Sequence, residues 1–189
     1  MARIAHVAVP DLPHRVTQRG NRREPVFFEA DDYRLYRRLV AAAARRAGTA
    51  VWAYCLMPNH VHLIVTPADA DGLRATFAEA HRRYTEAINA RFRWTGHLFQ
   101  GRFGVVVMDE PHLLAAAGYI ALDPVVTGLV SRAEDWPGGA RGRSSRVRMT
   151  NSQRWRRCAH CFPILPHFSP CRPARRRTGS SGPHHRSPA

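Results

Sequence analysis

The sequence predicts an α+β protein of the ferredoxin-like split-βαβ class: a four-stranded antiparallel sheet with helices on one face, followed by one more helix at the C-terminal end. Three observations lead to this prediction. Strand-like and helix-like segments alternate in the order β-α-β-β-α-β-α up to about residue 130. Two of the strand-like runs are separated only by the turn residues Pro58 and Asn59, which indicates a hairpin. The composition changes abruptly after residue 137, so the folded domain is expected to span residues 1–137.

The first strand and the first helix are predicted from local patterns. Residues 14–19 form the strand, and an arginine-containing loop over residues 20–25 follows it. The helix should begin near Asp31, because aspartate is a common N-cap, and run to Gly48, because glycine is typical just beyond a helix end. Its apolar stripe consists of Leu35, Tyr36, Leu39, Val40 and Ala43.

The middle of the chain is predicted to hold the hairpin and a long helix. Residues 51–57 and 60–66 should pair as its two strands. Residues 71–92 follow, with apolar residues at helical spacing, which predicts an amphipathic helix. The apolar side of this helix consists of Leu73, Phe77, Tyr84, Ile88 and Phe92.

A fourth strand and a last helix complete the predicted domain. Residues 103–108 are rich in valine, which favours a strand. Pro111 suits the first turn of a helix, and this helix is expected to end near Asp123 because Pro124 follows. On a helical wheel, one side consists of Leu113, Leu114, Ala117, Ile120 and Ala121. The opposite side consists of His112, Ala116, Tyr119 and Asp123.

Charge is distributed unevenly along the 189 residues, which carry a formal net charge of +15. Residues 1–140 contain 17 arginines and all 14 acidic residues, whereas residues 141–189 contain the other 12 arginines and no acidic residue. The predicted tail, residues 138–189, is rich in Arg, Ser and Pro, and such a composition predicts disorder. A GC-rich gene read out of frame yields the same composition, so a frameshift near residue 138 is a second interpretation.

Several classes of protein are excluded by the sequence. No apolar run reaches the roughly 18–20 residues that span a bilayer, and the first ten residues lack the apolar stretch of a secretory signal. Cys55 is the single cysteine among the first 140 residues, which argues against a disulfide scaffold and suits a cytoplasmic protein. Residues 158–161 contain two cysteines and a histidine, but they lack the second pair of ligands expected of a structural zinc site.

His60 and His62 flank one apolar residue within a predicted strand. Side chains alternate along a strand, so the two imidazoles should point to the same face, about 7 Å apart. Two imidazoles so placed can bind one metal ion. The alternative interpretation is a pair of half-buried histidines that only form hydrogen bonds.

Tyr119 and Asp123 lie four residues apart on the last predicted helix, and therefore on the same side of it. The functional interpretation is a nucleophilic phenol with a metal-binding carboxylate one turn away. The alternative is an interfacial tyrosine followed by an aspartate that ends the helix. Two histidines and a carboxylate also describe a non-haem iron or zinc site, so the ligands alone do not choose the metal.

Four segments of the chain resemble those of one family, the HUH single-tyrosine transposases and their REP-associated relatives. The likeness covers residues 1 to about 137, and the order and spacing of the segments agree with the family. The segments are Thr17-Gln18-Arg19-Gly20-Asn21-Arg22-Arg23, Tyr54-Cys55-Leu56-Met57-Pro58-Asn59-His60-Val61-His62-Leu63, Gly96-His97-Leu98-Phe99-Gln100-Gly101-Arg102-Phe103 and Gly118-Tyr119-Ile120-Ala121-Leu122-Asp123-Pro124.

The resemblance implies a DNA strand transferase that acts on single-stranded or hairpin DNA. It implies a divalent metal, Mg or Mn, on His60, His62 and Asp123. It also implies that Tyr119, on a C-terminal catalytic helix, attacks a phosphodiester to form a 5′-phosphotyrosine link. The alternatives are a domesticated or decayed relative that binds DNA without cutting it, and a metal-dependent oxygenase or hydrolase. The protein is expected to be a monomer or a homodimer.

The chain departs from the family pattern at several positions. Ala121 stands where relatives usually have histidine, and Asp123 stands where they have asparagine or glutamine. A carboxylate oxygen is a good ligand for a hard cation, so metal binding should survive, although the added negative charge beside a phosphate is expected to slow the chemistry. Val126 replaces a common arginine, and after Pro137 the family's Trp-Ser-Ser run is absent.

Arginines are clustered in the predicted domain, and polar or aromatic residues accompany them. Arginine side chains suit phosphate, and aromatic neighbours offer stacking surfaces for unpaired bases. The alternative interpretation is a set of solvated surface arginines. The candidate DNA-binding residues are Arg19, Asn21, Arg22, Arg23, Arg82, Arg83, Gln100 and Arg102.

Overall fold

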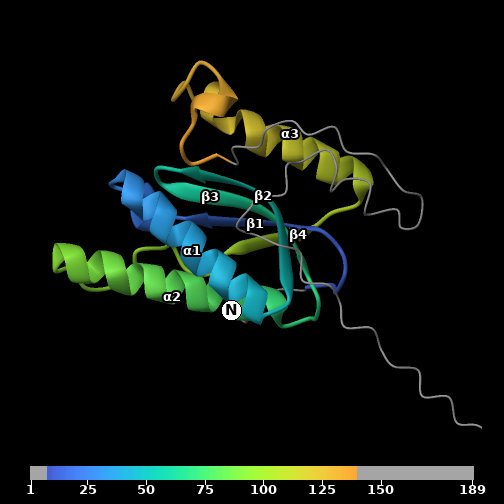
Figure 1. Ribbon diagram of the computed structural model, residues 1–189, viewed down its shortest axis with the longest axis horizontal. Helices are drawn as coiled ribbons and strands as arrows, with labels where there is room; N and C mark the ends of the chain where they lie inside the picture. Colours follow the sequence, from blue (N-terminus) through green and yellow to red (C-terminus); the bar gives the residue numbers. More distant parts are fainter. Residues whose placement is uncertain (1–7, 140–189) are drawn as a thin grey trace, which may run out of the picture.

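A computed structural model describes residues 8–139 and shows a four-stranded sheet between two layers of helices (Figure 1). The strands lie in the order β2-β3-β1-β4, and every pair is antiparallel. This order confirms the predicted split-βαβ class. The elements are β1 (His14–Arg19), the 3-10 turn η1 (Asn21–Arg23), α1 (Ala30–Arg46), β2 (Thr49–Met57), β3 (His60–Pro67), α2 (Gly72–Phe92), β4 (Gly104–Val107), α3 (Glu110–Val126) and the 3-10 turn η2 (Ala133–Asp135).

The register of the central strands sets which side chains share a face. In the β1–β3 pair, Arg19 lies opposite His60 and Thr17 lies opposite His62. Directly opposed residues point to the same side of a sheet. The histidines and this row of β1 therefore occupy one face, and the residues between them occupy the other.

Helices α1 and α2 cover one face of the sheet, as predicted, and enclose the larger hydrophobic core (Figure 1). Tyr36, Phe77 and Tyr84 are completely buried there. A buried tyrosine hydroxyl needs a hydrogen-bond partner, and both tyrosines have one. The Tyr84 hydroxyl donates to the Val26 carbonyl at 2.6 Å, and the Tyr36 hydroxyl lies 2.9 Å from Nε2 of His81.

Helix α3 lies on the opposite face of the sheet, where it covers β2 and β3 (Figure 1). Its contact is narrower than predicted, because Leu114 and Ala121 are exposed while Leu113, Ala117 and Ile120 are buried. The placement of Asp123 opposite the apolar stripe was also wrong. The buried residues of α3 are Leu113, Ala117, Ile120, Asp123 and Pro124.

The C-terminal end of α3 differs from the prediction as well. The helix continues past Pro124 to Val126. A proline removes only its own N–H from the helix, and residues after it can still donate. The Thr127 N–H donates to the Asp123 carbonyl at 3.0 Å, and the Thr127 hydroxyl donates to the same oxygen at 2.7 Å. These bonds close the last turn.

The end of the described chain is held against β2 by three residues that follow η2, namely Trp136, Gly138 and Gly139. The Trp136 indole donates to the Leu56 carbonyl at 3.0 Å, and the Leu56 N–H donates to the Gly138 carbonyl at 2.9 Å. A Cβ on Gly138 would lie 2.2 Å from the Leu56 carbonyl oxygen, so only glycine fits this approach. The folded chain therefore runs at least to Gly139, two residues beyond the predicted boundary at residue 137.

The remainder of the predicted tail, including the cysteines at 158 and 161, lies outside the described residues. Across residues 8–139, no helix combines the length and the apolar character needed to cross a bilayer.

Asp32 holds the start of α1 and joins it to the end of α2. Its carboxylate is 2% exposed and accepts hydrogen bonds from Arg91 at 2.7 and 2.9 Å, and from the N–H groups of Phe28 and Glu29 at 2.8 and 3.0 Å. Burial opposes ionisation of this group, but the bonds from Arg91 and from the two N–H groups outweigh it and lower its pKa.

We expect Asp32→Asn to lower the free energy of unfolding by about 2 kcal/mol at pH 7. This is less than the loss for a fully buried pair, because a third of the Arg91 side chain is exposed. The pKa is lower in the folded chain, so the stabilisation is complete above the ordinary value of 3.8 and is lost as the pH falls below it. Urea unfolding at several pH values measures both effects.

Asp31→Asn is the matched control, because Asp31 is exposed and its carboxylate pairs with Arg34 on the surface. Its effect should be about 0.5 kcal/mol or less. Equal losses in the two variants, or a loss in Asp32→Asn that persists unchanged in acid, would contradict this account.

Candidate metal centre

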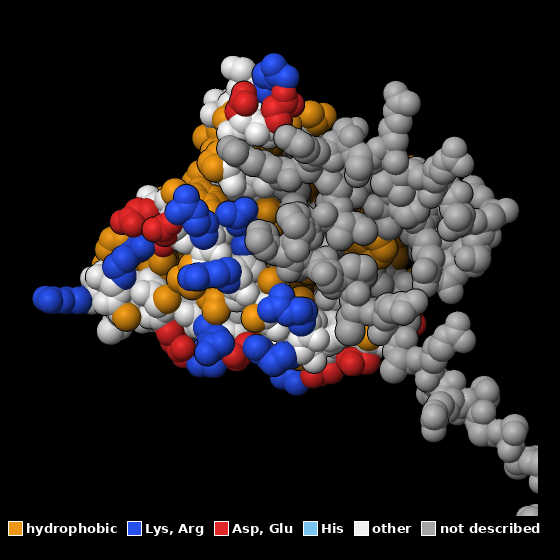
Figure 2. Space-filling view, viewed as in Figure 1, with side chains coloured by type: hydrophobic (Ala, Val, Ile, Leu, Met, Phe, Trp, Pro, Cys, Tyr) orange, Lys and Arg blue, Asp and Glu red, His pale blue; other side chains and the backbone are white. Residues whose placement is uncertain are grey.

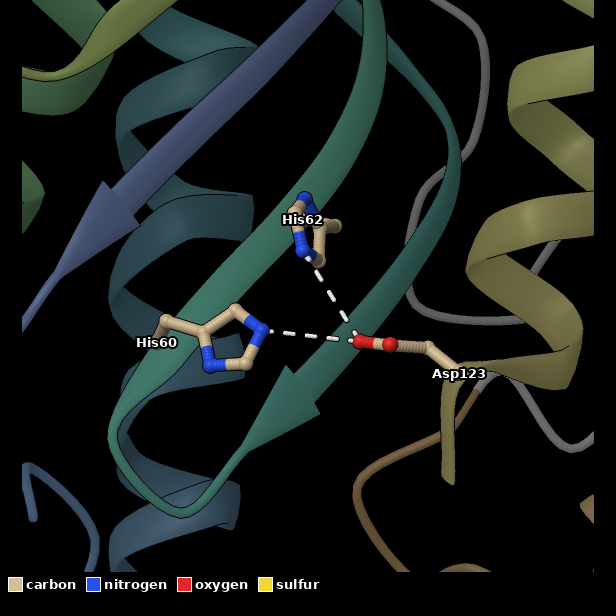
Figure 3. Close-up of side chains that lie close together, drawn as sticks. All are labelled: His60, His62 and Asp123. Carbon is tan, nitrogen blue, oxygen red and sulfur yellow. Dashed lines mark ion pairs between the residues drawn. The ribbon is translucent and has the colours of Figure 1, made fainter. Parts of the chain in front are cut away.

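His60, His62 and Asp123 converge between the sheet and α3 (Figure 3). The histidines come from alternate positions of β3, and the carboxylate comes from the last turn of α3. Nε2 of His60 lies 3.5 Å from Oδ2 of Asp123, and Nε2 of His62 lies 3.8 Å from the same oxygen. The three potential ligand atoms all lie within 4.8 Å of one another, which fits a single ion.

The nitrogen and oxygen atoms of this triad are better suited to binding a metal ion than to hydrogen bonding with one another. Oδ2 of Asp123 is buried and has no hydrogen-bond partner among the described residues, and the same holds for Nδ1 of His62. A buried carboxylate oxygen without a partner is costly. A divalent cation between the three side chains would satisfy this oxygen, and imidazole with carboxylate is a common ligand set.

Both histidines are held in the neutral form, which a metal ligand requires. Burial, and next the neighbouring His60, lower the pKa of His62 to about 4 despite the attraction of Asp123. Burial also lowers the pKa of His60, against the opposing effect of Asp123. At neutral pH each imidazole therefore offers a nitrogen lone pair.

Asn59 fixes which nitrogen of His60 faces Asp123. The Asn59 amide donates to the Arg23 carbonyl at 3.0 Å, so its own oxygen must face Nδ1 of His60, 2.7 Å away. Nδ1 then carries the hydrogen, and Nε2 presents its lone pair toward Oδ2 of Asp123. Two lone-pair atoms facing each other need a cation between them, and a partner that orients a ligating histidine in this way is typical of metal sites.

Tyr119 lies one helical turn before Asp123 and remains half exposed. Its ring meets the His62 ring edge to face, with centroids 5.7 Å apart. By contrast, Tyr54 and Tyr84 are buried in the core on other elements. Of these tyrosines, Tyr119 alone lies beside the triad with access to solvent.

Six of the eight predicted DNA-binding residues lie on β1, on the η1 turn and on the chain before β4. Arg19 ends β1 opposite His60, and its charge contributes to the low pKa of both histidines. The adjoining η1 turn contains Asn21, Arg22 and Arg23. Gln100 is tied to the same edge, because its N–H donates to the Arg19 carbonyl at 2.8 Å. Arg102 follows on the exposed chain before β4.

Arg82 and Arg83 are not brought to the triad, because α2 lies on the other face of the sheet. Arg82 pairs with Glu79 at 3.0 Å and with Glu86 at 2.7 Å, and Arg83 lies 3.7 Å from Glu79. Acidic side chains also lie among the arginines on the visible face over α1 (Figure 2). DNA contacts by these two arginines stay a prediction.

Two residues of β1 were missed by the sequence analysis. Arg15 and Thr17 point to the same face as Arg19, because side chains alternate along the strand, and they lie opposite Ile64 and His62. Arg15 is close enough to contribute to the low pKa of His62. Period-two spacing from Arg19 through the predicted strand would have found both residues once the face of the histidines was known.

Among residues 8–139, α3 packs on β2 and β3, and β1 and β4 form a strip of sheet beside the triad that no described helix covers on this face. On the same face of β4, Val106 and Gly104 are exposed. A Cβ on Gly104 would lie 2.7 Å from the Thr17 hydroxyl, so glycine is needed for this close approach of β4 to β1.

Comparisons with known proteins found a matching family model and similar solved structures. Residues 9–122 match a family model described as "Transposase IS200 like". A solved structure of a REP-associated tyrosine transposase bound to a REP hairpin is similar, with a TM-score of 0.63 and 22% identity over 74% of this chain and 82% of the other. A transposase structure from Deinococcus radiodurans R1 gives a TM-score of 0.45 and 22% identity over 63% of this chain and 95% of the other. No curated protein matches the chain.

A divalent cation such as Mn²⁺ should raise the melting temperature of the protein if the triad binds it. Binding to the folded state alone adds about 2.7 kcal/mol at a cation concentration 100 times Kd, which corresponds to about 5–10 °C for a domain of this size. His62→Ala should abolish the increase. Thermal melts with and without the cation measure it.

His112→Ala is the matched control for this measurement. His112 lies on α3, the helix that carries Asp123, and it pairs with another aspartate, Asp109. Both of these side chains are exposed and lie outside the triad. It should keep the full response. A response retained in His62→Ala would show that the cation binds elsewhere.

Proposed function

The chain belongs to the IS200-like transposase family, whose model matches residues 9–122, and from this premise we propose that it cuts and rejoins single-stranded or hairpin DNA. Tyr119 is the proposed nucleophile. His60, His62 and Asp123 would hold the divalent cation, Mg²⁺ or Mn²⁺. The proposal applies equally to a monomer and to a homodimer.

One observation carries this proposal. A half-exposed tyrosine lies one helical turn from a buried carboxylate that faces two neutral imidazoles. The same arrangement argues against an oxygenase with these ligands, since a phenol beside the metal has no role in that chemistry. Phosphoryl transfer uses both parts, because it needs a nucleophile and a centre that stabilises charge on the phosphate.

In the proposed reaction, the phenolic oxygen of Tyr119 attacks a phosphodiester phosphorus in line with the bond to the 3′ oxygen. A bond forms between tyrosine oxygen and phosphorus, the bond to the 3′ oxygen breaks, and the proton lost by the phenol is balanced by the proton gained by the 3′-OH. The bound cation would polarise the phosphate. Attack of a 3′-OH on the phosphotyrosine reverses the step and rejoins a strand.

The residues of β1 support a path for the DNA over the strip of sheet that β1 and β4 form beside the triad. Arg15 and Arg19 flank Thr17 on the face of the triad, and arginine side chains match phosphate oxygens well. The hydroxyl of Thr17 adds a neutral hydrogen-bond donor between them. A strand lying on this strip would bring its backbone next to Tyr119.

Tyr119→Phe should abolish a covalent protein–DNA adduct while leaving the fold and DNA binding unchanged. The substitution keeps the ring and removes only the attacking oxygen. The measurement is denaturing gel analysis after incubation with hairpin-containing single-stranded DNA and Mg²⁺ or Mn²⁺. Wild type should retain the strand with the 5′-phosphate on tyrosine and release a strand ending in a 3′-OH.

Tyr33→Phe serves as the control, because it removes a phenol on α1 that stacks on Phe27. It should form the adduct as wild type does. An adduct from Tyr119→Phe would mean that the nucleophile is misassigned. Binding without an adduct in wild type, with several hairpins and both metals, would favour a DNA-binding relative that no longer cuts.

Arg19→Ala should weaken DNA binding and reduce its salt dependence. Each phosphate contact that is lost should lower the slope of log K against log salt by about 0.7–0.9. Arg45→Ala is the matched control, since Arg45 is an exposed arginine near the end of α1, on the other helical layer. Fluorescence anisotropy at several salt concentrations measures both, and equal slopes for the two variants would place the DNA elsewhere.

A further inference from the structure

Three aromatic rings form an exposed cluster where α2 ends and α1 begins. The Phe92 and Trp94 rings stack with centroids 4.6 Å apart, and the Phe28 ring meets both edge-on at 4.9 and 5.6 Å. Trp94 is 48% exposed and Phe28 is 37% exposed. We call Phe28, Phe92 and Trp94 the aromatic platform. A contiguous patch of exposed rings is typical of a binding site for a ligand with an apolar surface.

The aromatic platform is held in place by the pair formed by Arg91 and the buried Asp32. Asp32 fixes the backbone of Phe28, and the Arg91 guanidinium lies over the Phe92 ring at 4.6 Å. Arg93 follows in the left-handed conformation and ends α2, and the Trp94 N–H bonds back to the Asn89 carbonyl at 2.9 Å. The rings are therefore presented on an ordered backbone.

A hollow of about 370 Å³ opens beside the aromatic platform. Phe28 and Trp94 form its apolar wall. Its polar lining includes Asn21, Arg22, Glu24 and His97. The side chains of Asn21 and His97 are exposed and form no hydrogen bond within residues 8–139.

Two of the segments noted in the sequence meet at this hollow. The Asn21 N–H donates to the Leu98 carbonyl at 2.8 Å, and Gly20 forms a bridge with Phe99. The segment with Arg22 and the segment with His97 therefore share this edge of the sheet. A Cβ on Gly20 would lie 2.1 Å from the Glu24 carbonyl oxygen, so this close approach requires glycine.

The hollow is linked directly to the metal centre. The Gly20 N–H donates to the Asn59 carbonyl at 2.8 Å, and the Asn59 side chain connects the Arg23 carbonyl to His60. Residues 20–28 thus contact the turn that carries the first metal ligand and also form one wall of the hollow. A DNA strand at the metal centre can reach the hollow along this same loop.

We propose that the hollow binds an unpaired nucleobase of single-stranded DNA, stacked on Trp94 and edged by Phe28. Arg22 neutralises an adjacent phosphate, and the polar groups of Asn21 and His97 meet the edge of the base. The inference rests on the proposed function for its ligand, DNA, but assigns a binding site separate from the metal triad.

The chemistry of the hollow favours a base over an apolar side chain of a protein. A flat aromatic wall with an arginine at its margin combines stacking with phosphate attraction, the pair of features that single-strand binding sites share. Glu24 adds a carboxylate that can accept a hydrogen bond from an exocyclic base amine. An apolar side chain would leave Arg22, Asn21 and His97 without partners.

The test compares oligonucleotides that contain one hairpin with unpaired flanks, intact or with a single abasic nucleotide at each unpaired position in turn. Affinities are measured by anisotropy in chelator, so that no cleavage occurs. For wild type, one abasic position should weaken binding about tenfold, as expected for one stacked base. Trp94→Ala should weaken binding of the intact DNA to the same degree and lose the response to that position.

Two variants make the result specific. Trp94→Phe keeps an aromatic surface and should retain most of the affinity and the abasic response. Leu129→Ala removes an exposed apolar side chain of similar exposure beyond α3 and should behave as wild type. Thermal melts check that every variant is folded.

The outcomes separate this inference from the proposed function. In one outcome, wild type forms the covalent adduct, but no abasic position has an effect that depends on Trp94. This result overturns the base site and leaves the proposed function standing. An abasic effect that depends on Trp94, with no adduct, supports the base site alone. A change in the self-association of Trp94→Ala, with DNA binding intact, would show that the aromatic platform contacts protein and would overturn the inference.

Discussion

Val61, Leu63 and Val65 of β3 point into the core under α1 and α2, and because side chains alternate along a strand, His60 and His62 must point toward α3. The core and the metal centre are therefore two faces of the same strand. A slip of one residue in the β1–β3 register would expose the valines and bury the histidines beneath the helices. Burial of the apolar face thus specifies the position of the ligands without any contribution from the metal.

The attachment of α3 depends on a different balance. Its apolar contact is narrow and consists of Leu113, Ala117 and Ile120, together with Met57, Ile64 and Trp136 on the other side. Asp123 lies at the edge of this contact, buried and facing two neutral nitrogens. An uncompensated carboxylate at that position works against the docking of the helix, whereas a cation would convert the same contact into a favourable one. Since Tyr119 lies on the same helix, metal binding at the triad would be coupled to the position of this proposed nucleophile.

Patterns within a single element were sufficient to predict most of the fold. β1 lies at its predicted residues, and α1, α2 and the hairpin differ only at their ends. The errors arise where tertiary contacts decide. Whether Leu114 is buried depends on how much of α3 the sheet can cover. Pro124 does not end α3 as predicted, because the residues after it can still close the helix. For the site, spacing alone brought His60 and Asp123 into consideration, but Arg15 became visible only through the pairing of β1 with β3.

The same pairing explains why the turn at Pro58 and Asn59 occupies a central place. Its carbonyl groups accept hydrogen bonds from Gly20, Val26 and Phe27, so the loop after β1 is folded against the hairpin that presents His60. That loop continues to Phe28 and from there to the capped start of α1. One short, hydrogen-bonded loop thus lies between the aromatic platform and the metal centre. Two consecutive arginines of this loop, Arg22 and Arg23, have positive φ angles of 52° and 65°. Such a conformation costs roughly 1–2 kcal/mol per residue and persists only where its surroundings hold it. The hairpin turn at one end of the loop and the start of α1 at the other therefore fix its conformation together.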